Sequence, residues 1–162
     1  MRIATVLLIA GLTFAAQAQQ HDPAQHQRHA AAAADAPAVH DPRQEVAFPP
    51  PMKQHTLSNM RDHLLALQEM QGALAQQAYD RAAEVAEQRL GMSSLGLHGA
   101  HEVAKFMPRG MQDAGSAMHR SASRFAIAAR DVSATGDVKP ALAAMSEVMG
   151  ACVACHAGYR LK

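Results

Sequence analysis

Residues 152 to 156 of the chain read CVACH and contain its only two cysteines. Two thiols and an imidazole within five residues suit three kinds of chemistry. They are a dithiol redox centre, half of a structural zinc site, and a covalent haem anchor, for which C-x-x-C-H is the attachment signature. The elements that carry the pentapeptide decide between these alternatives.

Composition favours helices over strands. The chain is rich in Ala and Met but has two Tyr, four Phe and no Trp, whereas strands prefer aromatic and β-branched residues. Pro and Gly residues divide the C-terminal part into four helical segments, at about 52–77, 79–90, 111–135 and 138–159. We therefore expect an all-α, antiparallel four-helix bundle with neighbouring helices about 20° from antiparallel and no sheet.

The apolar residues of each segment recur at intervals of three and four, which predicts one core-facing stripe per helix. Asp137 is expected to cap the N-terminus of the fourth helix. The expected stripes are Leu57, Met60, Leu64, Leu67 and Leu74; Tyr79, Ala82, Val85, Ala86 and Leu90; Met111, Ala114, Met118, Ser121, Phe125, Ala128 and Val132; and Leu142, Met145, Met149, Cys152, His156 and Tyr159.

On a helix, Cys152, Cys155 and His156 lie on one side within about one turn. A thioredoxin-like dithiol needs its first cysteine at a helix N-terminus after a strand. Here both cysteines lie deep in the last predicted helix, and no strand is expected before it. A structural zinc site needs four ligands, but the chain has no second cysteine pair. Haem attachment is favoured, with both sulfurs bound to the porphyrin edge and His156 bound to iron.

The beginning of the chain predicts export. It has a basic Arg2, an apolar run over 3–16 and the small-residue triplet Ala16-Gln17-Ala18, which is typical of a signal peptide over 1–18. Residues 19–46 are rich in Ala, His and Pro and are expected to form a flexible leader before a domain over 47–162. We expect a periplasmic protein without stable membrane insertion, since no second long apolar run is evident. After removal of Arg2 the charges balance at 14 basic and 14 acidic residues, which gives no indication of a nucleic-acid partner.

The C-terminal sequence CVACHAGYRLK, on the last helix of a chain of this size, resembles the class II c-type cytochromes, meaning cytochrome c′ and its low-spin relatives. The motif C-x-x-C-H-x-x-[YF]-[RK] is matched by Cys152, Cys155, His156, Tyr159 and Arg160, and the resemblance covers about residues 47–162. It implies a four-helix bundle with one covalent haem c, His156 as the proximal iron ligand and Arg160 close to the proximal face.

The distal side of the iron separates two functions. The segment PMKQHTLSNM resembles the low-spin pattern, in which a Met-Lys pair opens the first helix, so Met52 is the expected distal ligand. Met60, an open site or a nearby histidine are the alternatives. Methionine ligation indicates a single-electron carrier, not an enzyme, that works with a periplasmic redox partner. An open site indicates a five-coordinate protein that binds gases such as nitric oxide. The chain is expected to be a monomer or a homodimer.

The remaining histidines and methionines are expected to have structural or solvent-exposed roles. The alternative is a periplasmic metal-binding protein that uses these side chains and holds no haem. Where cytochrome c′ often has an Arg that reaches a haem propionate, this chain has Phe48, so the propionate partners are open. We expect His55 and His63 on solvated helix surfaces, and Met107, Met111 and Met118 in the core or at the haem edge. His98 and His101 are expected to form at most a weak surface metal pair. A solvated tail is expected to contain His21, His26, His29 and His40.

Overall fold

Prolines begin the long helices of the computed structural model, which describes residues 40–162. Pro50 and Pro51 occupy the first turn of α2, Pro108 precedes α5, and Pro140 lies in the first turn of α6, where the missing N–H costs no helical hydrogen bond. The elements are β1 (Gln44–Val46), α2 (Pro50–Ala75), α3 (Tyr79–Arg89), the 3-10 helix η1 (Met92–Ser94), α4 (Ala100–Ala104), α5 (Arg109–Thr135), α6 (Lys139–Gly158) and β2 (Tyr159–Leu161).

The ends of α5 and α6 follow from local chemistry. Gly136, directly after α5, has φ of 72°, a left-handed conformation that glycine adopts without a steric penalty. The side chain of Asp137 accepts a hydrogen bond from the N–H of Lys139 at 3.0 Å. The prediction that Asp137 is the N-cap residue was wrong by one position, because Val138 is the residue at the cap.

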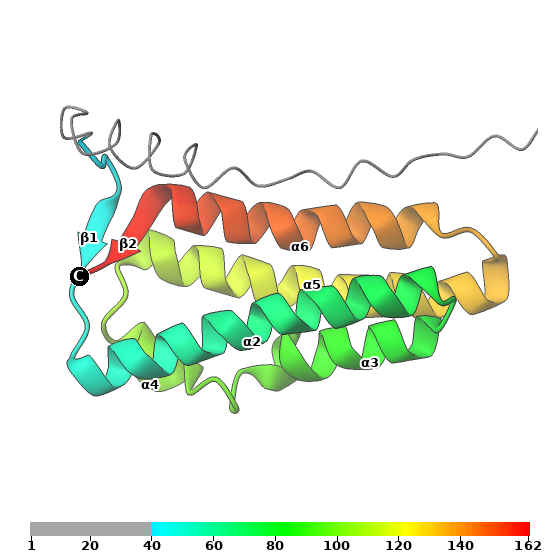
Figure 1. Ribbon diagram of the computed structural model, residues 1–162, viewed down its shortest axis with the longest axis horizontal. Coiled ribbons are helices and arrows are strands. Elements are labelled where there is room, and N and C mark those ends of the chain that lie inside the picture. The colour runs from blue at the N-terminus through cyan, green and yellow to red at the C-terminus, as the bar shows by residue number, and fades with distance from the viewer. Residues whose placement is uncertain (1–39) are drawn as a thin grey trace, which may run out of the picture. The chain divides into compact units, whose positions relative to one another are not determined.

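The helices lie alongside one another (Figure 1). Following the colours of Figure 1, α2, α3, α5 and α6 run in alternating directions. α5 packs against both α6 and α3, and α3 packs against α2. Direct contact between α2 and α6 is marginal by comparison. This packed helical architecture confirms the all-α prediction at the level of fold class.

The expectation of no sheet was wrong. β1 and β2 form a two-stranded parallel sheet in which Gln44 pairs with Tyr159, Glu45 with Arg160 and Val46 with Leu161. Parallel strands need a long crossover connection, and here all the helices together supply it. Three-residue strands carry too little periodicity to be recognised in the sequence. The sheet brings the residues before α2 to the residues after α6.

The main core lies between the helices and agrees with the expected stripes of α3 and α5. Ala82, Val85, Ala86 and Leu90 of the second segment are buried, and so are Met118, Phe125 and Val132 of the third. Tyr79 and Ala128 pack against this core while partly exposed. A second, smaller apolar cluster contains Val46, Phe48, Val103 and Met111.

The expected stripe of α2 was displaced from the true core face. Its buried residues are Thr56, His63, Ala66, Met70 and Ala73. Leu64 is 70% exposed, and Leu57, Leu67 and Leu74 are only partly buried. Large apolar residues occur on more than one face of α2, so periodicity did not identify the packed face. Ala66 and Ala73 on this face allow neighbouring helices to approach closely.

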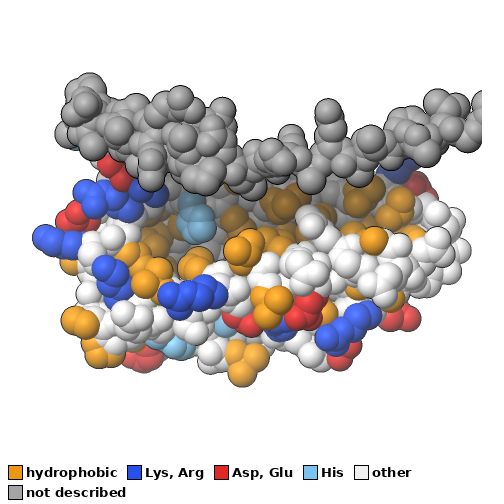
Figure 2. Space-filling model, in the orientation of Figure 1, with side chains coloured by type: hydrophobic (Ala, Val, Ile, Leu, Met, Phe, Trp, Pro, Cys, Tyr) orange, Lys and Arg blue, Asp and Glu red, His pale blue; other side chains and the backbone are white. Residues whose placement is uncertain are grey.

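The expected stripe of α6 was also partly wrong. Ala141, Met145 and Val148 are the buried residues of α6, whereas Leu142 is 52% exposed. Cys152 is half-buried and His156 is exposed, so the histidine is not a core residue. Figure 2 shows hydrophobic side chains gathered over α2 and α6. Among the described residues α6 alone is long and apolar enough for a membrane span, a property that core helices of soluble proteins share.

The predicted signal peptide (1–18) and most of the predicted leader (19–46) lie outside the described residues. Pro42–Lys162 forms one compact unit. The last residues assigned to the leader are therefore part of this unit, because β1 pairs with β2 and Val46 is only 5% exposed.

Candidate functional site

A cavity of about 420 Å³ lies beside the CVACH motif. Its size falls within the range of roughly 300–1,000 Å³ that is usual for small-molecule and cofactor sites. The walls come from Arg43 before β1, from α2, from Met107 between α4 and α5, from α5 itself and from the end of α6 with β2. The lining residues are Arg43, Lys53, Thr56, Leu57, Met60, Met107, Met111, Gly115, Cys155, His156, Tyr159, Arg160 and Leu161.

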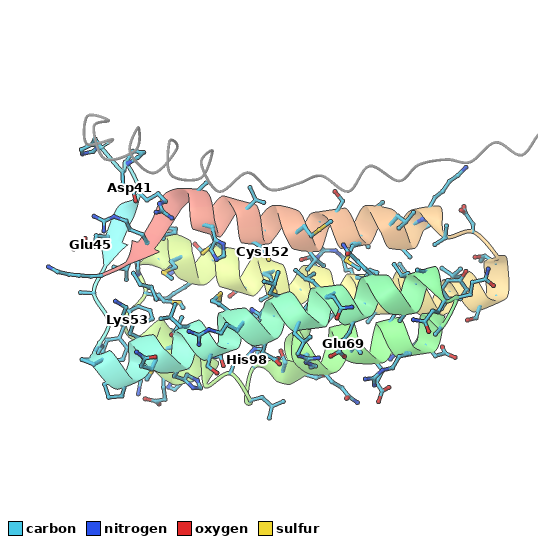
Figure 3. All side chains as sticks on the ribbon, viewed as in Figure 1. Asp41, Glu45, Lys53, Glu69, His98 and Cys152 are labelled. Atoms are coloured by element: carbon cyan, nitrogen blue, oxygen red, sulfur yellow. The ribbon has the colours of Figure 1, made fainter. Side chains whose placement is uncertain are left out.

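The CVACH side chains lie near the C-terminal end of α6 (Figure 3, Cys152 labelled). Cys155 and His156 line the cavity. Cys152 does not line it; this half-buried side chain packs against the main core, whereas Cys155 packs against the smaller cluster. Neither cysteine forms a disulfide. The structure therefore brings one thiol and the imidazole to the same cavity, with the second thiol one helical turn away.

The electrostatics of the two thiols argue against a dithiol redox centre. Burial raises the pKa of Cys152, and burial together with the neighbouring Cys152 raises the pKa of Cys155. Both groups are consequently protonated thiols near neutral pH. Catalytic cysteines instead have a lowered pKa that supplies the reactive thiolate.

Charged residues join the two ends of the compact unit next to the cavity. Arg160 Nη1 lies 2.7 Å from Glu45 Oε2, and Lys162 Nζ lies 3.5 Å from Glu45 Oε1. Lys53 Nζ donates to the carbonyl of Lys162 at 2.6 Å. Arg43 Nη1 donates to the carbonyl of His156 at 3.5 Å. Figure 3 shows Glu45 and Lys53 at this end of the molecule. Basic side chains thus border an otherwise largely apolar cavity.

The two methionines of α2 that the sequence singled out occupy different places. Met60 lines the cavity together with Met107, which lies between α4 and α5, and Met111 of α5. Met52 is not among the lining residues; it packs against the smaller apolar cluster, as Cys155 also does. Met111 and Met118 are buried as expected.

Sequence reasoning missed a second group of chemically active side chains. His63, expected on a solvated surface, is only 7% exposed, and His98 and His119 are buried with it. His55, by contrast, is exposed, and its Nε2 donates to the carbonyl of His98 at 2.8 Å. The three buried histidines are 35 and 21 residues apart, so no local pattern marks them as neighbours. His101, which was predicted to form at most a weak surface metal pair with His98, is exposed and is not one of the three buried histidines.

The side chains beside the cavity of about 420 Å³ fit a covalently attached haem. They combine two thiols and one imidazole on a single helix with apolar walls and basic groups suited to carboxylates. Comparisons of the chain with protein-family models, with curated proteins and with solved structures found no match. The function is therefore inferred from the sequence and from this site.

Proposed function

We propose that the chain is a periplasmic c-type cytochrome that carries single electrons, built as an antiparallel four-helix bundle around one covalent haem. The observation that carries the proposal is that Cys155 and His156 of the CVACH motif line one cavity of about 420 Å³. Half-buried, protonated thiols and an exposed imidazole are suited to holding a cofactor rather than to thiol redox exchange. Bound haem would supply the one-electron chemistry of its iron.

The residues of the chain have distinct parts in this proposal. Cys152 and Cys155, one helical turn apart, would hold the group covalently, and His156 would supply an imidazole ligand to its iron. The apolar side chains of the cavity exclude water, which strengthens electrostatic interactions inside it. Lys53 and Arg160 border the cavity and are the candidates for pairing with the carboxylates of the group.

The sixth ligand is proposed to be a methionine of α2. Met52 is the candidate from the sequence resemblance, while the cavity favours Met60, which lines it together with His156. A thioether ligand excludes gases and stabilises the reduced iron, as an electron carrier requires. Met60→Leu and Met52→Leu distinguish the two, because only loss of the true ligand converts a low-spin visible spectrum into a high-spin one.

The attachment is tested by the mass of the denatured polypeptide purified from the exported fraction. We expect one haem per chain. Cys152→Ser and Cys155→Ser should each remove one covalent link, so that the group becomes easier to extract, and the double variant should lose it. Val153→Ser is the matched control because Val153 lies between the two cysteines and is 67% exposed. If the denatured wild-type chain has the mass of the polypeptide alone, without haem, the proposal is contradicted.

The electron-transfer role is tested by visible spectra of both oxidation states. A low-spin spectrum in each state, with no uptake of carbon monoxide by the reduced protein, is the expected result. A five-coordinate reduced form that binds carbon monoxide readily would replace electron transfer by gas binding, while leaving the attachment intact.

A further inference from the structure

Three buried histidines surround a second cavity, of about 170 Å³. His63 comes from α2, His98 from the segment between η1 and α4, and His119 from α5. The ring centroid of His63 lies 4.5 Å from that of His98 and 6.1 Å from that of His119, and the last two are 5.5 Å apart. We call this cavity and its three imidazoles the histidine chamber (Figure 3, His98 labelled).

Two ring nitrogens of the histidine chamber face each other. His63 Nε2 and His98 Nδ1 are 3.4 Å apart and form a hydrogen bond in which one of them carries the proton, and Ser94 Oγ also lies 3.4 Å from His98 Nδ1. In the tautomers that place each proton on the other ring nitrogen, the two facing nitrogens would offer lone pairs to one ion. His119 Nδ1 lies 2.7 Å from the carbonyl oxygen of Leu90, which only accepts, so Nδ1 carries the proton and Nε2 carries a lone pair.

The environment keeps the imidazoles neutral, as metal ligation requires. Burial lowers the pKa of His98 and of His119, and for His63 burial and the neighbouring His98 lower the pKa to about 4. Near neutral pH the three rings are therefore neutral, so each has one ring nitrogen that can bind a metal.

Soft sulfur atoms and an unpartnered hydroxyl complete the lining of the histidine chamber. Met60, Met107 and Met118 line it, and Met60 and Met107 also line the larger cavity. Thr56 Oγ1 is buried without a hydrogen-bond partner and also lines both cavities. A buried hydroxyl of this kind indicates that the cavity holds something polar, because an unmade hydrogen bond costs roughly 1–3 kcal/mol.

We propose that the histidine chamber binds one Cu(I) ion through His63 Nε2, His98 Nδ1 and a thioether of Met107 or Met118. Among the described residues no three His, Cys, Asp or Glu side chains form a metal cage, so the third donor is sulfur rather than a third imidazole. Imidazole and thioether together select a soft monovalent copper ion. A doubly charged ion such as Zn²⁺ is disfavoured because these neutral ligands would leave a larger charge buried.

His63 and His98 do not line the cavity proposed for haem, although Met107 lines both cavities; Cu(I) itself is the probe. Full-length protein is titrated with Cu(I) under reducing conditions against a chromophoric Cu(I) chelator. His63→Gln and His98→Gln should each weaken the affinity of one site per chain by at least about 100-fold, since even outer-shell changes cost roughly 10–100-fold. His101→Gln, an exposed neighbour in α4, is the matched control and should leave the affinity unchanged.

The double variant Cys152→Ser and Cys155→Ser distinguishes Cu(I) binding in the histidine chamber from Cu(I) binding to the cysteines. It should still bind one Cu(I) ion in the histidine chamber. Folding of each variant is checked by circular dichroism. X-ray absorption of the Cu(I)-loaded double serine variant supplies a test that does not depend on the folding of histidine variants. A first shell with two imidazoles and one sulfur supports the proposal. A shell without imidazole, or unchanged affinity in folded His63→Gln and His98→Gln, overturns it.

Discussion

Burial sets the protonation states of the side chains at both cavities. The thiols of Cys152 and Cys155 stay protonated because burial disfavours the thiolate, and the imidazoles of His63, His98 and His119 stay neutral because burial disfavours the cation. The same effect therefore acts on groups of opposite charge type. It leaves each cavity lined by neutral donors that suit a cofactor or a soft metal.

The buried histidines predict a dependence of stability on pH in metal-free protein. Unfolding returns His63 from a pKa of about 4 to its ordinary 6.5, so the unfolded state binds more protons between these values. The stabilisation is complete above the unfolded pKa and is lost as the pH falls toward the folded one. We expect the free energy of unfolding to decrease by about 2 kcal/mol from about pH 7.5 to about pH 5 for His63 alone.

Urea denaturation in the presence of a metal chelator measures this dependence. His63→Gln should lose the part of the slope that His63 contributes, whereas His101→Gln should keep the full slope because His101 is exposed. A wild-type free energy of unfolding that does not change across this pH range would contradict the burial of neutral imidazoles.

Phe125 is the largest fully buried side chain of the main core. Phe125→Ala is expected to lower the free energy of unfolding by about 3–5 kcal/mol, because it removes apolar contacts and leaves a cavity. Ile127→Ala is the control on the same helix. Ile127 is 60% exposed, so its loss should cost no more than about 0.5 kcal/mol. Chemical denaturation of both variants decides the matter, and equal costs would contradict the assigned core face of α5.

At the scale of elements, β1 and β2 fix the cavity end of the molecule. β1 leads into α2 and β2 follows α6, so their pairing connects the two helices that bound the larger cavity without packing extensively on each other. Val46 anchors β1 in the smaller apolar cluster, to which Met52 and Cys155 also pack. The strand pair is thus a small structural element that positions a large part of the site.

Val46→Asp tests the docking of β1. A carboxylate placed at this buried position is expected to destabilise the protein by roughly 2–3 kcal/mol and to release β1 from the cluster. Gln44→Asp introduces the same charge on an exposed residue of the same strand and should cost at most about 0.5 kcal/mol. Limited proteolysis before α2, together with urea denaturation, measures both effects. If protease cleaves the two variants before α2 at the same rate, Val46 does not anchor the strand.

At the scale of the whole molecule, the larger cavity lies where segments distant in sequence meet. Its lining extends from Arg43 to Leu161, so filling it stabilises contacts that only the complete fold provides. If haem occupies this cavity, its apolar surface is removed from water and the folded protein is stabilised. Polypeptide with attached haem should then have a Tm at least about 5 °C above that of the double variant Cys152→Ser and Cys155→Ser. Thermal unfolding followed by far-UV circular dichroism measures the difference, and an identical Tm would contradict occupation of the cavity.

The sequence by itself determined the helical class, the positions of the helix starts at prolines, and the clustering of Cys152, Cys155 and His156 on one helix. These features depend on local backbone chemistry and on spacing within one or two turns. Only the tertiary structure decided which face of α2 is buried, that β1 pairs with β2, and that Met60 rather than Met52 lines the cavity. It also brought His63, His98 and His119 together. Such contacts depend on how helices pack across large sequence separations, which a periodic pattern along one helix does not encode.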